Sequence, residues 1–171
     1  MVIDVSDPAS MVHPDISGMK FNAPGDHDGR AIYLLSNKLY FGRISGDDSP
    51  NEPNFFILDI SDPASILSFG SKFIKRNPTQ PLGLTAVVVS GQFAFFGTTD
   101  SNAEFQVFKI DDPSNILNCS EAAYPGNFAD CGKYDFPAKI NDLEYDENLV
   151  FSAIESNDAL RIIFDDVSQY P

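Results

Sequence analysis

The chain repeats one pattern of apolar and polar positions. In its clearest copy, the apolar run at residues 55–58 is followed at once by polar residues that include Asp62 and Pro63. The run has little polar alternation, as expected of a strand covered on both faces by neighbouring sheets. Asp62 can bond the backbone two residues further on, and Pro63 fixes φ for a turn while removing a ladder donor. The pattern predicts a buried strand that ends in a tight turn; the alternative is a short helix with Pro63 at its first position.

The same strand and turn occur again along the chain, at residues 2–10 and 107–117. A fainter copy at residues 162–170 lacks the Asp-Pro pair. The prolines of the first three copies lie 55 and 50 residues apart (63 − 8 and 113 − 63), close to the length of one propeller blade. The residues of the predicted repeat turns are Asp7, Pro8, Asp62, Pro63, Asp112 and Pro113.

A second motif lies between these copies and consists of two apolar strands around a short polar break. The breaks fall near Ser36, Ser90 and Asp146, which lie 54 and 56 residues apart (90 − 36 and 146 − 90). Two strands joined by so short a break form a hairpin. The three hairpins are predicted to begin at Ile32, Ala86 and Asp142. Each complete unit then holds a hairpin, the stopped strand and a fourth strand after the Asp-Pro turn.

Four antiparallel strands in each unit, with no helical stretch between them, predict an all-β fold: a β-propeller of four-stranded antiparallel blades. A β-sandwich is the competing architecture, but it does not require every unit to repeat one order of elements. The predicted units divide one propeller fragment, residues 1–171, into a partial blade 1–27, blades 28–81 and 82–137, and a partial blade 138–171. Propellers close with about four to eight blades. About three blades therefore predict an open arc, completed by the remaining blades of a longer chain or by a homo-oligomer.

The composition narrows the choice of partners. With 43% hydrophobic and 21% charged residues the chain is typical of a globular domain. Its formal net charge of −14 would repel nucleic acid and anionic lipid. The acidity suits solubility or an extracellular or high-salt habitat, and the alternative is a dedicated cation-binding role. No apolar run approaches the length of a membrane span, so no direct membrane insertion is expected. A repeat copy is already under way at Met1, so we expect any targeting signal or anchor to lie upstream.

Residues that could carry chemistry are sparse. The histidines, His13 and His27, are not accompanied by a zinc-ligand motif. Residues 26–29 look like half a calcium loop, but the remaining ligands are absent at the expected spacing, which favours a solvated acidic turn. Glu144 and Asp146 fall on one face of a strand, where a wet surface is commoner than an acid/base couple. We predict no catalytic residue, no cofactor and no metal.

The two cysteines, Cys119 and Cys131, lie in the same passage between a fourth strand and the next hairpin. This passage is longer than its counterpart in the preceding unit. A disulfide would close a short loop and contribute about 3 kcal/mol under the chain-entropy model in an oxidising compartment. We predict this disulfide; the alternative is two free thiols.

The motifs resemble those of the LVIVD-repeat β-propellers, whose units hold an inner strand, Ser-Gly-Asn, an aromatic strand and then Leu-Gln-Ile-Ile-Asp-Val-Ser-Asp-Pro. Residues 89–95 and 56–63 match closely, and the resemblance covers nearly the whole chain. It departs at Lys109, where the repeat has Asp, and at residues 169–170, where Asp-Pro is missing. Such repeats are typical of secreted or surface-attached bacterial and archaeal proteins. The resemblance therefore implies an extracellular or cell-surface location, and it brings no catalytic residues.

We expect a non-enzymatic propeller repeat module, a rigid scaffold for contacts with protein or glycan. The alternative is a propeller enzyme, hydrolase or lyase-like, with its site at the channel mouth where the starts of the inner strands converge. The candidate residues of that alternative are Arg30, Thr85, Asn141 and Asp142. A concave pocket that gathers several polar side chains there would favour the enzyme.

Overall fold

A computed structural model describes residues 7, 9–10, 21–25, 27–44, 52–62, 64–77, 80–118 and 132–164. Within these ranges the regular elements are all strands, and they pair antiparallel, so the prediction of an all-β chain is confirmed. None of the described residues belongs to a helix long and apolar enough to cross a membrane.

Three larger sheets follow one another along the chain, each ordered as its strands occur in the sequence. The first sheet holds β1 (Gly29–Leu35), β2 (Lys38–Arg43), β3 (Phe55–Asp59) and β4 (Leu67–Lys72). The central sheet holds β7 (Leu84–Ser90), β8 (Phe93–Thr98), β9 (Phe105–Lys109) and β10 (Leu117–Asn118), with β11 (Lys133–Tyr134) also paired to β9. The third sheet holds β12 (Ile140–Asp146), β13 (Leu149–Ile154) and β14 (Leu160–Phe164). A small hairpin of β5 (Lys75–Asn77) and β6 (Gln80–Pro81) connects the first two sheets.

The three hairpins have the predicted breaks, but their first strands begin earlier than predicted. They start at Gly29, Leu84 and Ile140 rather than at Ile32, Ala86 and Asp142. In each strand the register shifts just after this first residue, as at a β-bulge. A bulge adds one residue to a strand and interrupts its alternation of side chains. The apolar pattern therefore becomes visible only beyond the bulge.

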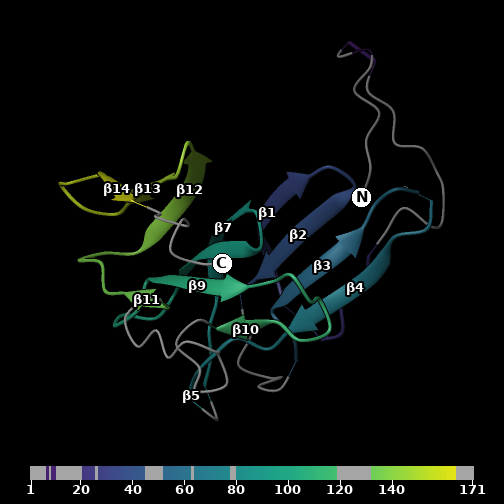
Figure 1. Cartoon of the computed structure of the whole chain (residues 1–171), viewed down its shortest axis with the longest axis horizontal. Helices are drawn as coiled ribbons and strands as arrows, with labels where there is room; N and C mark the ends of the chain where they lie inside the picture. The colour runs from purple at the N-terminus through teal and green to yellow at the C-terminus, as the bar shows by residue number, and fades with distance from the viewer. Residues whose placement is uncertain are drawn as a thin grey trace.

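The first strands of the three hairpins lie side by side, with β7 between β1 and β12 (Figure 1). Buried side chains fill the space on both sides of the central sheet. Val87 and Val89 of β7 belong to the cluster shared with the first sheet, whereas Ala86 and Val88 belong to the cluster shared with the third. This is why β7 shows almost no polar alternation.

Strand β3 is also buried on both faces, and within the described part of the chain a sheet covers one of them. Phe55 and Ile57 pack in the cluster shared with the central sheet. On the other face, the ring of Phe21 contacts Phe56, with centroids 5.2 Å apart, and Phe41, at 6.5 Å. Among the described residues a loop aromatic, Phe21, lies on the second side of β3, and the predicted sheet on that side falls outside the described residues.

Candidate functional site

The predicted repeat turns share one hydrogen-bond pattern. The Oδ1 atoms of Asp7, Asp62 and Asp112 accept the backbone N–H two residues further on, at 3.0, 2.9 and 3.0 Å. Their backbone carbonyls accept the N–H three residues further on, at 3.0, 2.9 and 2.9 Å. These are tight turns, and β3 and β9 end just before the turns at Asp62 and Asp112. Pro113 is described, whereas Pro8 and Pro63 lie outside the described residues.

The aspartate just before the turn has a structural role that the sequence did not reveal. The Oδ1 atom of Asp59 accepts the N–H of Ser61 at 2.9 Å, and hydrogen bonds from Ser61 lower the pKa of Asp59. In the central sheet Lys109 stands at this position, and its Nζ lies 3.2 Å from Oδ2 of Asp111. Where the repeat has an aspartate that accepts a backbone hydrogen bond, the central sheet thus has a lysine that forms an ion pair with Asp111.

The four channel-mouth candidates come from equivalent places at the starts of the inner strands. Arg30, Thr85 and Asn141 fall within the three bulges, and Asp142 follows the last of them. Thr85 is 4% exposed, and its Oγ1 donates to the carbonyl of Ile140 at 2.6 Å. The side chains of Arg30, Asn141 and Asp142 are exposed. Among the described residues no hydrogen bond or ion pair joins any two of these four, and Thr85 is used to tie β7 to β12.

In each of the first two sheets, one buried polar side chain forms hydrogen bonds with the segment that leads to the next sheet. Asn54, just before β3, accepts the N–H of Ile74 at 2.8 Å and donates to the carbonyls of Ile74 and Leu82 at 2.7 and 2.5 Å. Glu104, just before β9, accepts the N–H of Phe136 at 2.9 Å. This equivalence could not be predicted from the sequence, because an amide in one sheet is replaced by a carboxyl in the other.

Glu104 is 6% exposed, which makes its charge costly. Burial raises the pKa of Glu104, and the adjacent carboxyl of Asp135 raises it further, while the N–H groups of Glu104 and Phe136 act in the opposite direction. Ala159 occupies the equivalent place before β14, because its carbonyl accepts the N–H of Ile154. The carbonyls of Asn54 and Glu104 accept in the same way from the N–H groups of Arg43 and Thr98. Alanine has no side-chain acceptor, so the third sheet lacks this tie.

A buried arginine attaches the chain before β1 to the first sheet. Arg43 is 2% exposed, donates to the carbonyl of Pro24 at 2.8 Å and to that of Pro53, and lies over the ring of Phe56 at 5.0 Å. Burial lowers the pKa of Arg43, whereas the nearby Glu52 raises it. Cys119 and Cys131 of the predicted disulfide, His13, and Asp26 of the calcium-like turn lie outside the described residues. His27 is described, and its Nε2 lies 3.7 Å from Oε2 of Glu52.

We call the face of each sheet that is turned toward the next sheet its leading face. The side chains on the three leading faces can be compared in rows of cross-strand neighbours. In the row nearest the bulge, cross-strand neighbours are Ala31, Gly42 and Phe55 in the first sheet, Ala86, Gly97 and Phe105 in the central sheet, and Asp142, Ala153 and Leu160 in the third. The next row holds Tyr33, Tyr40 and Ile57, then Val88, Phe95 and Val107, then Glu144, Phe151 and Ile162. The third sheet thus carries carboxylates where the other two carry apolar side chains.

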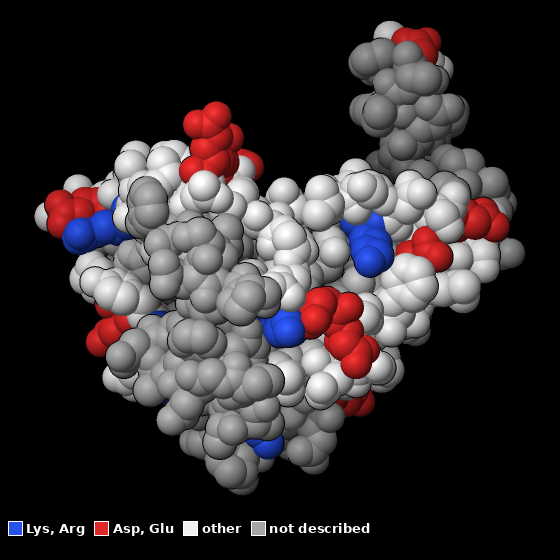
Figure 2. Space-filling view, viewed as in Figure 1, with Lys and Arg blue, Asp and Glu red and all other residues white. Residues whose placement is uncertain are grey.

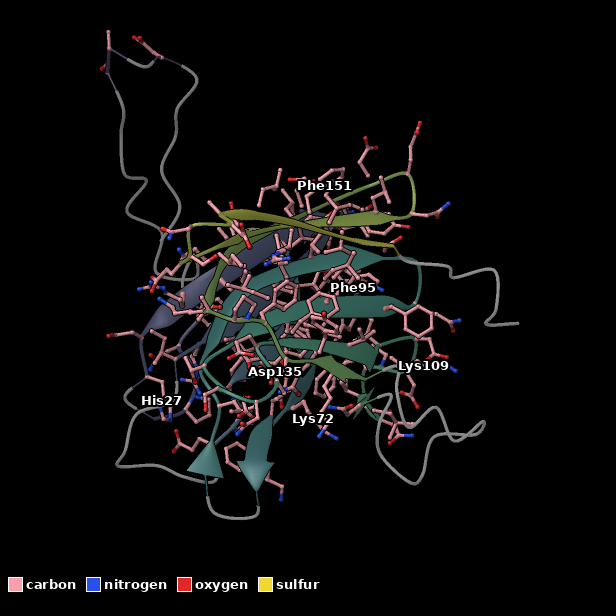
Figure 3. All side chains as sticks on the ribbon, turned by 90° about the vertical axis from the view of Figure 1, so that its left-hand side faces the viewer. His27, Lys72, Phe95, Lys109, Asp135 and Phe151 are labelled. Atoms are coloured by element: carbon pink, nitrogen blue, oxygen red, sulfur yellow. The ribbon has the colours of Figure 1, made fainter. Side chains whose placement is uncertain are left out.

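The leading face of the third sheet is open, whereas those of the first two are covered. Phe105 and Val88 of the central sheet are 4% and 0% exposed, but Leu160 and Ile162 are 63% and 57% exposed. Asp142, Glu144 and Asp146 are exposed as well, which agrees with the predicted wet strand face. Figure 2 shows acidic side chains projecting beside the tip of β12. Figure 3 shows Phe95 on the central sheet, beneath the third sheet that carries Phe151.

Residues 1–14 and 51–71 match the family model of the LVIVD repeat. The predicted resemblance is therefore confirmed at these two segments. The second LVIVD segment spans β3, the Asp62 turn and most of β4. The copy around Asp112 lies outside the two matched segments, and it is the copy that carries Lys109 in place of the repeat's aspartate.

No curated protein matches the chain. Among solved structures it is similar to the computationally designed Ika8 protein, with a TM-score of 0.50, 13% sequence identity, and coverage of 80% of this chain and 33% of that one. For the computationally designed Ika4 protein the TM-score is 0.49, with 12% identity and coverage of 80% and 66%. The chain thus spans about a third of the Ika8 protein and just under two thirds of Ika4. The likeness to Ika8 concerns the fold alone.

Proposed function

We propose that this chain is a non-enzymatic β-propeller repeat module whose three larger sheets are consecutive blades. It acts at the cell surface or outside the cell as a rigid scaffold for contacts with protein or glycan. The observation that carries the proposal is the repeated leading face, in which equivalent rows of the first and central sheets each pack against the first strand of the next sheet. The matched LVIVD segments support the same interpretation.

Three successive sheets suit a propeller better than a sandwich, because a sandwich has only two sheets around one core. Here the central sheet has a separate buried cluster on each side. Its first strand, β7, contacts the first strands of both neighbours, as expected when blades are arranged around one axis.

The buried polar groups favour a scaffold over an enzyme. Arg43, Asn54 and Glu104 are directed at backbone groups of neighbouring loops, and Thr85 is bonded to the carbonyl of Ile140. Their contacts hold segments together, and this is a sufficient physical reason for their burial. The acidic surface and the LVIVD segments support an extracellular location, since such repeats are typical of secreted proteins.

A binding screen and an activity screen on the same preparation would test the proposal. We expect saturable binding to a surface protein or a glycan from an array, without turnover in a panel of hydrolase and lyase substrates. Binding should survive Asp142→Asn, which changes the channel-mouth candidate without disturbing the core. Turnover that this substitution abolishes would contradict the scaffold and support the enzyme.

A further inference from the structure

The open face of the third sheet is acidic along its first strand. Asp142 stands where the other sheets have alanine, and Glu144 where they have tyrosine or valine. Asp146 follows on the same face of β12. Among the described residues no ion pair joins a lysine or arginine to these three, and the cations Lys139 and Arg161 pair with Glu155 and Asp158.

The other two strands of the open face are apolar. Leu160 and Ile162 of β14 are largely exposed, and Leu149 and Phe151 of β13 are partly buried. Among the described residues β14 is also the edge of its sheet. An exposed apolar face beside an open edge is a site where chains associate, and natural proteins control such sites with charged side chains.

Two further features show that this face is not built like the faces that pack on a following sheet. A Cβ atom on Gly42 would lie 2.9 Å from Cβ of Leu84, and one on Gly97 would lie 2.9 Å from Cγ2 of Ile140. Each glycine thus leaves room for the first strand of the next sheet. The third sheet has Ala153 at this position, and it has Ala159 where the other sheets have the tie to the following chain.

The face at the opposite end of the stack is partly occupied by a loop of the same chain. Ile32 and Leu34 of β1 are 69% and 59% exposed, but Phe21 covers Phe41 and Phe56 of the two adjoining strands. Arg43 fixes the loop that carries Phe21 through its bond to Pro24. The open face of another copy is thus the better match for this face, and such isologous pairing is the commonest form of dimer.

We propose that Asp142, Glu144 and Asp146 keep the open face of the third sheet from packing against the same face of a second copy. Face-to-face contact would bring three carboxylates from each copy into one poorly hydrated interface. Their desolvation and mutual repulsion oppose the burial of Leu160 and Ile162. Once these charges are removed, the apolar strands are free to associate. This inference concerns self-association and does not depend on the ligand of the proposed scaffold.

Sedimentation velocity on the full chain would test the proposal. The variant Asp142→Asn/Glu144→Gln/Asp146→Asn keeps side-chain size at exposed positions, so it should fold like the unmodified protein. The control, Glu147→Gln/Glu155→Gln/Asp158→Asn, makes the same change in net charge at other exposed positions and also removes the ion pairs of Lys139 and Arg161. We expect the face variant to self-associate at least about tenfold more tightly than the control and the unmodified chain.

A second pair of variants identifies the surface that associates. Ile162→Lys added to the face variant should restore the monomer, whereas Ile32→Lys, at the other end of the stack, should leave association unchanged. A graft of central-sheet residues, Asp142→Ala/Glu144→Val/Ala153→Gly, should associate at least as strongly as the face variant. Equal behaviour of face variant and control, or loss of association with Ile32→Lys instead, would overturn the proposal. The proposal would also be overturned if the face variant and the graft both fold and stay monomeric.

Discussion

The central and third sheets have the same strand order and the same bulge, yet they have opposite relations to solvent. In the central sheet both faces are buried, and its side chains belong to two hydrophobic clusters, one on each face. In the third sheet only the face with Leu143 and Val150 is buried, while the face with Glu144 and Ile162 is open. The repeat therefore specifies strand order and turns, whereas the side chains that its strands carry on one face decide whether that face packs on another sheet.

Phe95 and Phe151 occupy equivalent positions in the central and third sheets, and their replacement should give the largest difference in the free energy of unfolding. Phe95 is 3% exposed, and its ring lies 6.1 Å from that of Phe105 and 5.9 Å from that of Tyr145. Phe95→Ala should lower the free energy of unfolding by about 3–5 kcal/mol, whereas Phe151→Ala, on the open face, should cost about 1 kcal/mol or less. Urea denaturation of both variants measures the difference. Similar losses would show that the open face is buried in solution.

The tie at Asn54 gives the next largest effect. Asn54→Ala removes the buried partner of the Ile74 N–H and of the Leu82 carbonyl, while the Ile74 carbonyl keeps the N–H of Leu82; the loss should cost about 3 kcal/mol. The converse change, Ala159→Asn, occupies the equivalent position in the third sheet and should alter stability by less than about 0.5 kcal/mol. Thermal unfolding of the two variants compares the sites. A substantial gain from Ala159→Asn would mean that this sheet also leads to a packed segment.

How much of this arrangement was visible in the sequence depends on the kind of signal. The turns at Asp62 and Asp112 and the hairpin breaks were predictable, because Asp-Pro pairs and short polar breaks have strong local preferences. The bulges at the strand starts were not, since a single extra residue interrupts the alternation on which the prediction rests. Leu160 and Ile162 gave no signal of exposure, because an apolar strand in the sequence does not show whether a partner covers it.

The candidate site was less predictable than the fold. Thr85 was placed at a channel mouth from its position at a strand start, but its hydroxyl is bonded to Ile140, which lies 55 residues away in sequence. Asn54, Glu104 and Arg43 were not singled out, because an isolated polar residue before or after an apolar strand carries no sign of a distant backbone partner. Glu144 and Asp146 were predicted as a wet strand face from their period-two spacing, and both are exposed.

The glycine at the sheet contact gives a smaller effect. A Cβ on Gly97 would meet Oγ1 of Thr85 at 2.7 Å and Ile140 Cγ2 at 2.9 Å, so Gly97→Ala should destabilise the protein by about 1–3 kcal/mol. Ala153→Gly makes the opposite change in the third sheet and should cost no more than about 1 kcal/mol, mainly through backbone entropy. Chemical denaturation gives both values, and a harmless Gly97→Ala would contradict the close approach of β8 and β12.

The smallest effect concerns pH. Because the folded pKa of Glu104 is raised, the folded chain binds more protons than the unfolded chain between the ordinary value of 4.5 and the raised value. The stabilisation by neutral Glu104 is complete below pH 4.5 and is lost as the pH rises through the raised pKa of the folded chain. Glu104→Gln, which resembles Asn54 in the first sheet, should therefore be more stable than the unmodified chain at neutral pH. This advantage should shrink on acidification, and a pH-independent difference between the two unfolding curves would contradict the argument.

Hydroxyl-radical footprinting tests the central comparison most directly, because it reports the solvent exposure of individual side chains. The pairs to compare are Phe105 with Leu160 and Val107 with Ile162, which occupy equivalent rows of the central and third sheets. After correction for the intrinsic reactivity of each residue type, Leu160 and Ile162 should be modified rapidly and Phe105 should be protected. Protection of Leu160 and Ile162 equal to that of Phe105 would show that another surface covers the third sheet, and it would contradict this account.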